Sequence, residues 1–287
     1  MDIINFLKII LKGISQIMLQ NNAITGFLFL IGIFYNSPIM GFGALIGVFA
    51  STIIAFILKY KKKDIEDGLY GFNGALVGIA LTFFFNVNFL FNNFIILGSI
   101  LSSLVMNFMH KRKLSPYTFP FVLSTWFLII LIRYYDLVPQ KIQTLIEVAN
   151  LNFVSSLSMG FGQVMFQANI ITGIIFLIAI LINSKISAIY AFIGSFIGMI
   201  TAILFSFQLN LINLGIFGFN AVLCGIAFAD NKKYSLVYAV ISIIISIFII
   251  YGMITLNWIA LTAPFVFATW ITLALRKVVS QKIKYFN

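Results

Sequence analysis

The chain contains 287 residues, of which 62% are hydrophobic and 9% are charged, and its formal net charge is +11 at pH 7. Soluble domains are nearly half apolar and about a quarter charged, so this composition excludes an ordinary soluble protein. Apolar runs recur along the whole chain, many of them long enough to cross a bilayer, which predicts a polytopic membrane protein. Lysines in cytoplasmic loops account for the positive charge, and we expect no nucleic-acid partner.

The first part of the chain contains one short pre-segment and five apolar spans. The N-terminal run has no A-x-A-like cleavage site and is interrupted by lysines, so we interpret it as mature chain. The pre-segment, about residues 6–22, carries Gln and Asn, which predicts a half-length segment buried inside the protein. Whether it re-enters or merges with the next span stays open. The spans expected after it are 23–36, 38–58, 69–85, 92–109 and 118–134.

The rest of the chain repeats this pattern after a linker at 135–151. ISQIMLQNNAITG from Ile14 matches FGQVMFQANIITG from Phe161 at an offset of 147, and TFPFVLSTW matches TAPFVFATW at an offset of 144. Paired Gln, Asn, Gly, Pro and Trp residues in one register indicate an internal duplication. We therefore expect a first copy at 1–134 and a second at 152–287. The second copy has a pre-segment at 152–169 and expected spans at 170–183, 185–205, 214–229, 234–251 and 260–276.

Basic residues distinguish the two copies. In the first copy they follow the second and fourth spans, and in the second copy they follow the first, third and fifth. An odd number of crossings per copy makes the second copy start from the opposite side. With both termini cytoplasmic, sixteen of the 18 Lys and Arg lie inside, and only Arg133 and Lys141 lie outside, as the positive-inside rule requires. This predicts an all-α fold of ten transmembrane helices in two inverted five-helix repeats, with interrupted or re-entrant half-helices lining a central pore.

No ionisable side chain is expected deep in a span. All seven acidic residues fall at termini, in loops or in the linker, and His110 lies in a basic loop. Ion-coupled carriers place such groups inside the membrane, and enzymes need a nucleophile, a base or a metal cluster. We therefore expect a neutral substrate, uncoupled transport, no catalytic residue, no metal and no cofactor. The one cysteine, Cys224, excludes an internal disulfide and suits a packed core position.

The spans carry a duplicated set of amides, hydroxyls and rings. Asn73 stands in GLYGFNGALVG and Asn220 in GIFGFNAVLCG, although an unpaired amide in hydrocarbon is costly. Thr118 and Thr262 each stand two residues before a proline, a pattern that predicts carbonyl oxygens free to face a pore. The structural alternative is that intramembrane amides join helices and that the Gly-x-x-x-Gly after Asn73 packs two helices closely.

These motifs resemble those of the urea transporter family. The resemblance rests on the two GFN segments, the two T-x-P-F motifs and the GQVMFQ pre-segment, and it extends from about Gln16 to Trp270. It implies ten spans in two inverted halves, a pore within each protomer and a homotrimer. It also implies passive, channel-like passage of urea through two binding regions that flank a narrow centre.

The resemblance also implies a set of residues that bind urea along the pore. They are the filter-end amides Gln16 and Gln163, the slot residues Phe72, Phe219, Phe166 and Leu19, and the waist residues Leu76, Leu223, Thr118 and Thr262. Asn73 and Asn220 belong to the GFN signature, and we expect them to support the filter structurally rather than to touch the solute.

The sequence departs from the family pattern L-P-x-x-T-x-P-F at the first proline. Ser115 and Ile259 stand at that position in the two copies. Some members carry an acid where Gln163 stands, and Leu19 replaces a frequent aromatic. These departures leave the solute open among urea, its close analogues and ammonia.

Two other classes are a membrane-embedded enzyme and a non-conducting scaffold. The spans contain no Cys-His, Ser-His or paired-carboxylate constellation, which disfavours the enzyme, and the duplicated polar residues disfavour the scaffold. We expect an integral, multi-pass protein of a bacterial inner membrane, surrounded by lipid and with both termini cytoplasmic.

Overall fold

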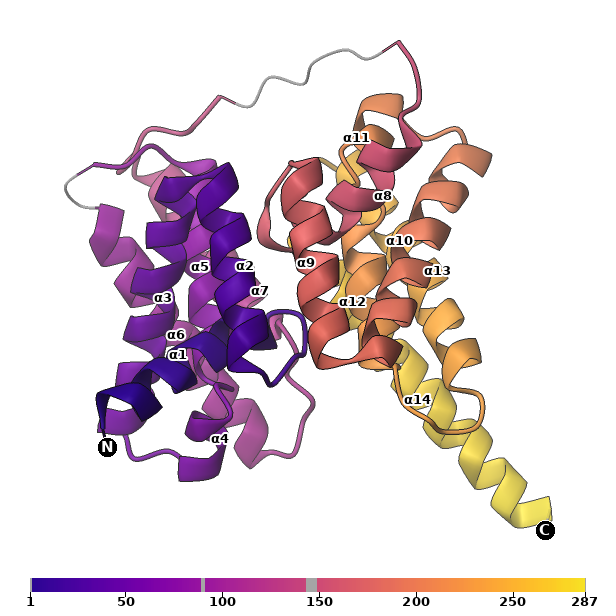
Figure 1. Cartoon of the computed structure of the whole chain (residues 1–287), viewed down its shortest axis with the longest axis horizontal. Helices are drawn as coiled ribbons and strands as arrows, with labels where there is room; N and C mark the ends of the chain where they lie inside the picture. Colours follow the sequence, from indigo (N-terminus) through magenta and orange to yellow (C-terminus); the bar gives the residue numbers. More distant parts are fainter. Residues whose placement is uncertain (1, 89–90, 143–148, 287) are drawn as a thin grey trace.

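The computed structural model describes residues 2–88, 91–142 and 149–286, and every regular element in these ranges is a helix. The first copy contains α1 (Ile3–Gln16), α2 (Ala23–Asn36), α3 (Pro38–Ile57), α4 (Lys62–Glu66), α5 (Gly71–Phe84), α6 (Phe91–Lys111) and α7 (Phe119–Tyr134). The second contains α8 (Phe153–Gly162), the 3-10 turn η1 (Gln163–Met165), α9 (Ile170–Asn183), α10 (Lys185–Leu204), α11 (Leu209–Asn213), α12 (Phe219–Ala227), α13 (Ser235–Thr255) and α14 (Ala263–Phe286). Figure 1 shows one helical bundle per copy, with α2 and α9 facing each other between the bundles.

Side-chain caps set the start of the helix that follows each pre-segment. The Asn22 Oδ1 atom accepts hydrogen bonds from the Ile24 and Thr25 N–H groups at 2.8 and 3.0 Å. Asn169, at the equivalent position, accepts from the Thr172 N–H at 3.1 Å. Because the first N–H groups of a helix lack intrahelical partners, these asparagines explain why both copies begin a helix at the next residue.

A helix coincides with each of the ten expected spans, although α12 is shorter than expected and the last helix continues to Phe286. In the described part of the chain, α3, α6, α10, α13 and α14 are long and apolar enough to cross a bilayer, and the bent pair α8–η1 and α9 makes a sixth if it counts as one span. α2 and α5 contain 14 residues each, about 21 Å, whereas the hydrocarbon core is about 30 Å thick. The helical multi-pass class therefore holds, while ten full-length spans remain a prediction.

The pre-segments are separate helices. In the second copy the pre-segment Phe153–Met165 and the helix Ile170–Asn183 are bent by 73° at the break between them. In the first copy α1 runs obliquely across the lower part of the bundle, beneath α2 (Figure 1). The pre-segment of the second copy therefore does not merge with the next helix into one straight span.

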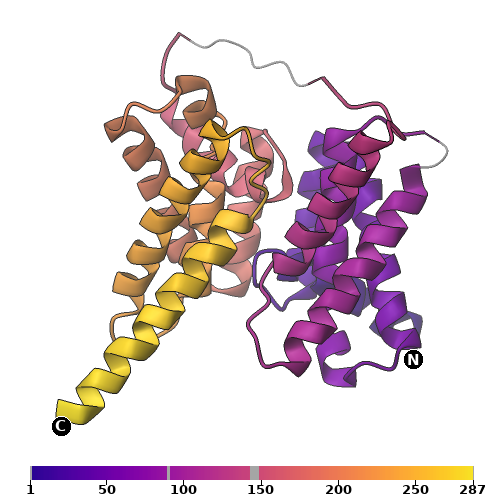
Figure 2. The ribbon, with the colours of Figure 1, turned by 180° about the vertical axis from the view of Figure 1, so that it is seen from behind.

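The equivalent helices outside the contact of α2 with α9 include pairs that lie at opposite ends of the molecule. The bounds of α2 and α9, of α3 and α10, and of α4 and α11 differ by the same 147 residues. Figure 1 shows α1 and α4 in the lower part of the first bundle and α8 and α11 in the upper part of the second. Figure 2 shows both chain termini at the lower end of the molecule.

Reciprocal contacts join the copies along α2 and α9. Phe29 and Phe176 are equivalent residues, and they meet edge to face with ring centroids 5.0 Å apart. The Thr25 hydroxyl donates to a carbonyl oxygen of α9 at 2.9 Å. Thr172, its equivalent, donates to the Gly32 carbonyl oxygen of α2 at 3.1 Å. Thr25 near the start of α2 contacts Ala179 near the end of α9, and Gly32 near the end of α2 contacts Thr172 near the start of α9. The two helices are therefore antiparallel.

Buried amides extend these contacts at both ends of the helix pair. The Asn36 Nδ2 group donates to Gln167 Oε1 at 2.8 Å. Asn183 Nδ2, at the position equivalent to Asn36, donates to Gln20 Oε1 at 2.7 Å. Gln20 and Gln167 are almost fully buried, and each amide oxygen receives its hydrogen bond from the opposite copy.

Glycines bring α3 and α5 into backbone contact. A Cβ atom on Gly47 would lie 2.0 Å from the Gly74 carbonyl oxygen, and one on Gly78 would lie 1.9 Å from the Gly43 carbonyl oxygen. Real Cβ atoms do not approach backbone so closely, so these positions need glycine. The helix-packing interpretation of Gly74-x-x-x-Gly78 is confirmed.

The described part of the linker lies against the end of α5. The Asn86 N–H donates to the Pro139 carbonyl oxygen and the Lys141 N–H to the Phe84 carbonyl oxygen, both at 2.9 Å. The Lys141 Nζ group donates to the Thr82 carbonyl oxygen at 2.7 Å. Residues 143–148 of the predicted linker lie outside the described residues.

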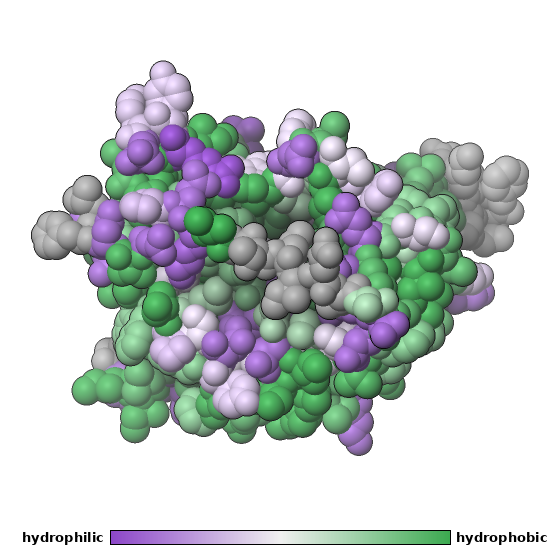
Figure 3. All heavy atoms as spheres, turned by 90° about the horizontal axis from the view of Figure 1, so that it is seen from above, coloured by the Kyte–Doolittle hydropathy of each residue, from purple (hydrophilic) through white to green (hydrophobic). Residues whose placement is uncertain are grey.

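The surface is apolar where helices face outward. Large hydrophobic side chains are exposed along the helices, including Ile130 on α7 and Leu204 on α10. Figure 3, which views the molecule from above, shows hydrophilic residues gathered over this end and hydrophobic residues along much of its margin. Because a soluble protein rarely exposes so much contiguous apolar surface, this distribution suits an integral membrane protein.

The glycine contact between α3 and α5 yields a stability prediction. Gly47→Ala should lower the thermal unfolding midpoint in detergent by several degrees, because the new methyl group meets the Gly74 backbone and overpacking costs about 1–3 kcal/mol. Gly252→Ala is the matched control, since no atom lies within 4 Å of the added Cβ. Equal midpoints for the two variants would contradict the packing assignment.

Candidate functional site

Asn73 and Asn220 each hold the start of another helix. The Asn73 Oδ1 atom accepts from the Phe121 N–H of α7 at 3.1 Å, and Asn220 Oδ1 accepts from the Phe265 N–H of α14 at 3.0 Å. Phe121 and Phe265 are the third residues of their helices, where the N–H groups lack intrahelical partners. These buried side chains therefore cap the helices that begin within the T-x-P-F motifs, as a structural role requires.

The side-chain NH2 group of each asparagine also has a partner. Asn73 Nδ2 lies 3.8 Å from the Met106 sulfur, and Asn220 Nδ2 donates to the Leu261 carbonyl oxygen at 3.4 Å. Both residues are almost fully buried. The protein itself therefore satisfies the two amides that the GFN motifs place in an apolar interior.

The two waist threonines meet each other. Their hydroxyl oxygens are 2.7 Å apart, and both residues are 1% exposed. The carbonyl oxygens of the threonines themselves are engaged, because the Val122 N–H donates to the Thr118 carbonyl oxygen and the Val266 N–H to the Thr262 carbonyl oxygen. Polar contact at the centre comes from the hydroxyl groups instead, on equivalent residues of the two copies.

Three of the predicted first-copy residues line one cavity. Gln16, Leu19 and Phe72 border a space of about 320 Å³. The Gln16 Nε2 group donates to the Asp67 carbonyl oxygen at 2.9 Å, which leaves its amide oxygen available as an acceptor. Leu76, one turn after Phe72 on α5, is fully buried.

The predicted second-copy residues are arranged differently. Gln163 opens η1 and is mostly buried, and its amide makes no hydrogen bond with the described residues. The Phe166 ring contacts Phe83 and Phe84 of the first copy, at centroid distances of 5.0 and 5.9 Å. Phe219 begins α12, and Leu223, one turn later, is fully buried.

Leu19 and Phe166 share an unusual backbone conformation. Their φ angles are +57° and +60°, in the left-handed region that non-glycine residues rarely adopt. Both residues lie where a pre-segment ends and the chain turns toward the next helix. Lys59 and Ser206 adopt the same conformation two residues after α3 and α10, so the left-handed residue here serves to end a helix.

Sequence reasoning missed four residues beside these positions. Phe83 and Phe84 contact Phe166, and His110 and Tyr117 line the cavity that contains Gln16. The Phe-Phe-Phe run at 83–85 was the one visible signal, but it has no aromatic counterpart in the second copy. The described residues contain no group of three His, Cys, Asp or Glu side chains that could hold a metal ion.

The fold and the paired polar residues define the class as a multi-pass helical membrane protein built around two similar copies. The chain belongs to the urea transporter family, since the family model for urea transporters matches residues 7–277. This confirms the resemblance seen in the sequence, and the family is one of transporters rather than enzymes.

Mammalian relatives share roughly a third of the aligned residues. The chain is 31% identical over 242 residues to urea transporter 1 of Mus musculus and 30% identical over 242 residues to that of Rattus norvegicus. It is 29% identical over 241 residues to urea transporter 1 of Capra hircus. Each alignment covers 78% of this chain and 63% of the relative, so the chain spans less than two thirds of the length of these proteins.

The asparagine caps yield a second stability prediction. Asn73→Leu should lower the thermal unfolding midpoint, because it leaves the buried Phe121 N–H without its acceptor, a loss of about 1–3 kcal/mol. Asn93→Leu makes the same change at an exposed position of α6 and should leave the midpoint nearly unchanged. If both variants melt like the parent protein, the capping role of Asn73 is wrong.

Proposed function

We propose that this protein conducts urea passively through a pore within each protomer. The observation that carries the proposal is the hydrogen bond of 2.7 Å between Thr118 and Thr262. Predicted solute-binding residues of the first copy, Gln16, Leu19 and Phe72, border a cavity, and the threonine pair marks the waist that the family resemblance assigns to the middle of the pore. The mammalian relatives are named urea transporter 1, and urea is the substrate that we propose for this chain.

Urea matches the chemistry of these groups. It is small, flat and neutral, and it carries two NH2 donors and one carbonyl acceptor. The amide oxygens of Gln16 and Gln163 accept from its NH2 groups, and the Phe72, Phe166 and Phe219 rings enclose its faces. The threonine hydroxyls exchange their mutual hydrogen bond for bonds to the solute, so passage strands no buried polar group.

Transport is uncoupled in this proposal. The buried polar side chains among the described residues are Ser, Thr, Asn and Gln, with no buried Asp, Glu, Lys, Arg or His. Coupling to protons or sodium ions requires an ionisable or coordinating group along the path. His110 borders the cavity that contains Gln16 but is only partly buried, and the absence of such groups among the buried side chains supports flow that depends on the urea gradient alone.

We further propose that the copies form an inverted repeat and that three protomers assemble in the membrane. The antiparallel contacts of α2 and α9 and the placement of equivalent helices at opposite ends (Figure 1) support the inversion. Both termini lie at one end of the molecule, which we propose faces the cytoplasm. Residence in a bacterial inner membrane and the trimer are proposals from the sequence.

Urea flux into proteoliposomes, followed by stopped-flow light scattering, tests the function. Wild-type protein should give fast, weakly saturating flux that is unaffected when proton and sodium gradients are collapsed. Gln163→Leu should lower the flux severalfold, because it removes a solute acceptor without stranding a protein partner.

The control for Gln163→Leu is Gln208→Leu, the same change at an exposed position outside the site. It should conduct urea like the parent protein. A urea flux that depends on the proton or sodium gradient would contradict the channel mechanism. Equal urea flux in the two glutamine variants would contradict the assignment of Gln163 to the filter.

Side-specific labelling tests the topology. Lys61→Cys and Lys232→Cys should react with an impermeant maleimide from the same side of oriented vesicles, because six of the expected crossings, an even number, separate these two loops. The native cysteine, Cys224, is fully buried and provides the unlabelled background. Labelling from opposite sides would contradict the inverted arrangement.

A further inference from the structure

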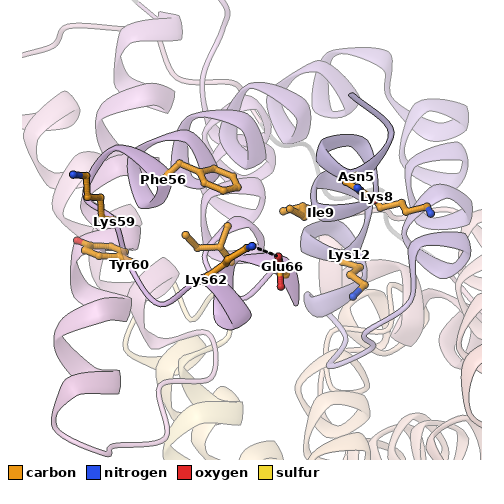
Figure 4. A pocket seen from close by; sticks show the side chains of 10 residues that line it. Asn5, Lys8, Ile9, Lys12, Phe56, Lys59, Tyr60, Lys62 and Glu66 are labelled. Atoms are coloured by element: carbon orange, nitrogen blue, oxygen red, sulfur yellow. Dashed lines mark ion pairs between the residues drawn. The ribbon is translucent and has the colours of Figure 1, made fainter. Parts of the chain in front are cut away.

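A basic cavity opens at one end of the first copy and shares no lining residue with the cavity that contains Gln16. It has a volume of about 650 Å³ and lies between α1, the end of α3 and α4 (Figure 4). Four lysines and one glutamate line it, together with apolar and aromatic residues. They are Lys8, Lys12, Lys59, Lys62, Glu66, Asn5, Ile9, Phe56, Tyr60 and Ile65.

The positive charge around this cavity is only partly neutralised. Lys62 pairs with Glu66 at 3.7 Å, and Lys12 pairs with Asp67 at 3.6 Å. Lys8 and Lys59, which flank the cavity on opposite sides in Figure 4, have no carboxylate within 4.0 Å among the described residues. Lys8 and Lys12 are also four residues apart on one helix, a spacing at which like charges repel. An anionic group in the cavity would neutralise the unpaired lysines and reduce the repulsion between Lys8 and Lys12.

The cavity lies at a membrane boundary. α3 is a membrane-span candidate that ends at Ile57, and Lys59 and Tyr60 are the second and third residues after it. Lysine and tyrosine at the end of a span are typical of the headgroup level. Beside the cavity, Ile3 and Ile4 of α1 are 78% and 66% exposed, so the lysines border a surface that is suited to acyl chains.

The second copy provides an internal comparison. At the offset of 147, the four cavity lysines correspond to Ser155, Met159, Ser206 and Leu209. There Asn213, the counterpart of Glu66, accepts from the Asn152 N–H at 2.8 Å and from the Ser155 hydroxyl at 3.1 Å. The same helices thus pack without basic residues in the second copy, so the duplicated fold does not require the lysines.

We propose that this cavity binds the phosphate-bearing headgroup of an anionic phospholipid. Lysines at a helix end near the bilayer surface attract anionic lipid headgroups, and the cavity is large enough for a phosphoglycerol group. The exposed isoleucines of α1 favour a lipid over a soluble phosphate, because they give its chains an apolar surface beside the cavity. The ligand class is a phosphate anion in either case, and the experiment separates the two sources.

Native mass spectrometry of the full-length protein in neutral detergent tests the proposal. The protein is titrated with dioctanoyl phosphatidylglycerol and, separately, with dioctanoyl phosphatidylcholine and inorganic pyrophosphate. Phosphatidylglycerol should bind most tightly. Lys8→Gln/Lys59→Gln should weaken its binding roughly fivefold for each lysine removed.

Two matched variants complete the design. Lys63→Gln/Lys111→Gln removes the same charge at exposed positions outside the cavity and should bind like the parent protein. Lys8→Arg/Lys59→Arg keeps the charge and should retain binding. If the double glutamine variant is not monodisperse, the single variant Lys59→Gln replaces it in the titration. Equal loss in the control pair, equal binding of both lipids, or preference for pyrophosphate would overturn the assignment.

Discussion

An amide buried in an apolar interior must find a partner, and in this protein the partner is often in the other copy. Gln20 receives its hydrogen bond from Asn183, and Gln167 receives its bond from Asn36. Trp126 likewise donates to the Ile259 carbonyl oxygen at 2.8 Å, and its equivalent Trp270 donates to that of Ser115 at 2.8 Å. Because neither copy can satisfy these groups alone, separating the copies would expose several unpaired polar atoms at once. The two copies therefore form one folding unit, and their relative position is specific.

The same requirement positions the candidate site. Asn73 and Asn220 hold the first turns of α7 and α14, and the threonines stand immediately before those turns. The distance between the Thr118 and Thr262 hydroxyls is therefore set by two caps and by the contacts between the copies. A change in either asparagine would disturb the helix start that it caps and, with it, the position of the threonine beside that start. The GFN signature thus acts by fixing the geometry of the neighbouring motif.

The helical segments at the ten expected positions and the glycine packing could be predicted from the sequence, because each leaves a periodic pattern of apolar or small residues. Helix lengths could not, since hydropathy does not reveal where a helix ends among other apolar helices, and α12 ends as early as Ala227. The hydroxyl contact between the threonines could not be predicted either, because it forms only where the starts of α7 and α14 meet. The hydrogen bond of Gln20 with Asn183 could not be predicted either, because nothing in the sequence indicates that these two distant residues meet. Nor could the contact of Phe83 with Phe166 be foreseen, because it arises only when the copies meet.

The two copies carry equivalent residues along the contact of α2 with α9 and differ at the ends of the molecule. Residues at the mutual contact, such as Phe29 and Phe176, face their own equivalents, so a change in one must suit the other. At the ends of the molecule this constraint is absent, and there lysines line a cavity in the first copy, whereas Asn213 makes hydrogen bonds at the equivalent place in the second. In the proposed passive mechanism such asymmetry cannot give a preferred direction to net flux, because the urea gradient alone sets it. Differences between the ends can act only on what binds there, and the basic cavity lies at such an end.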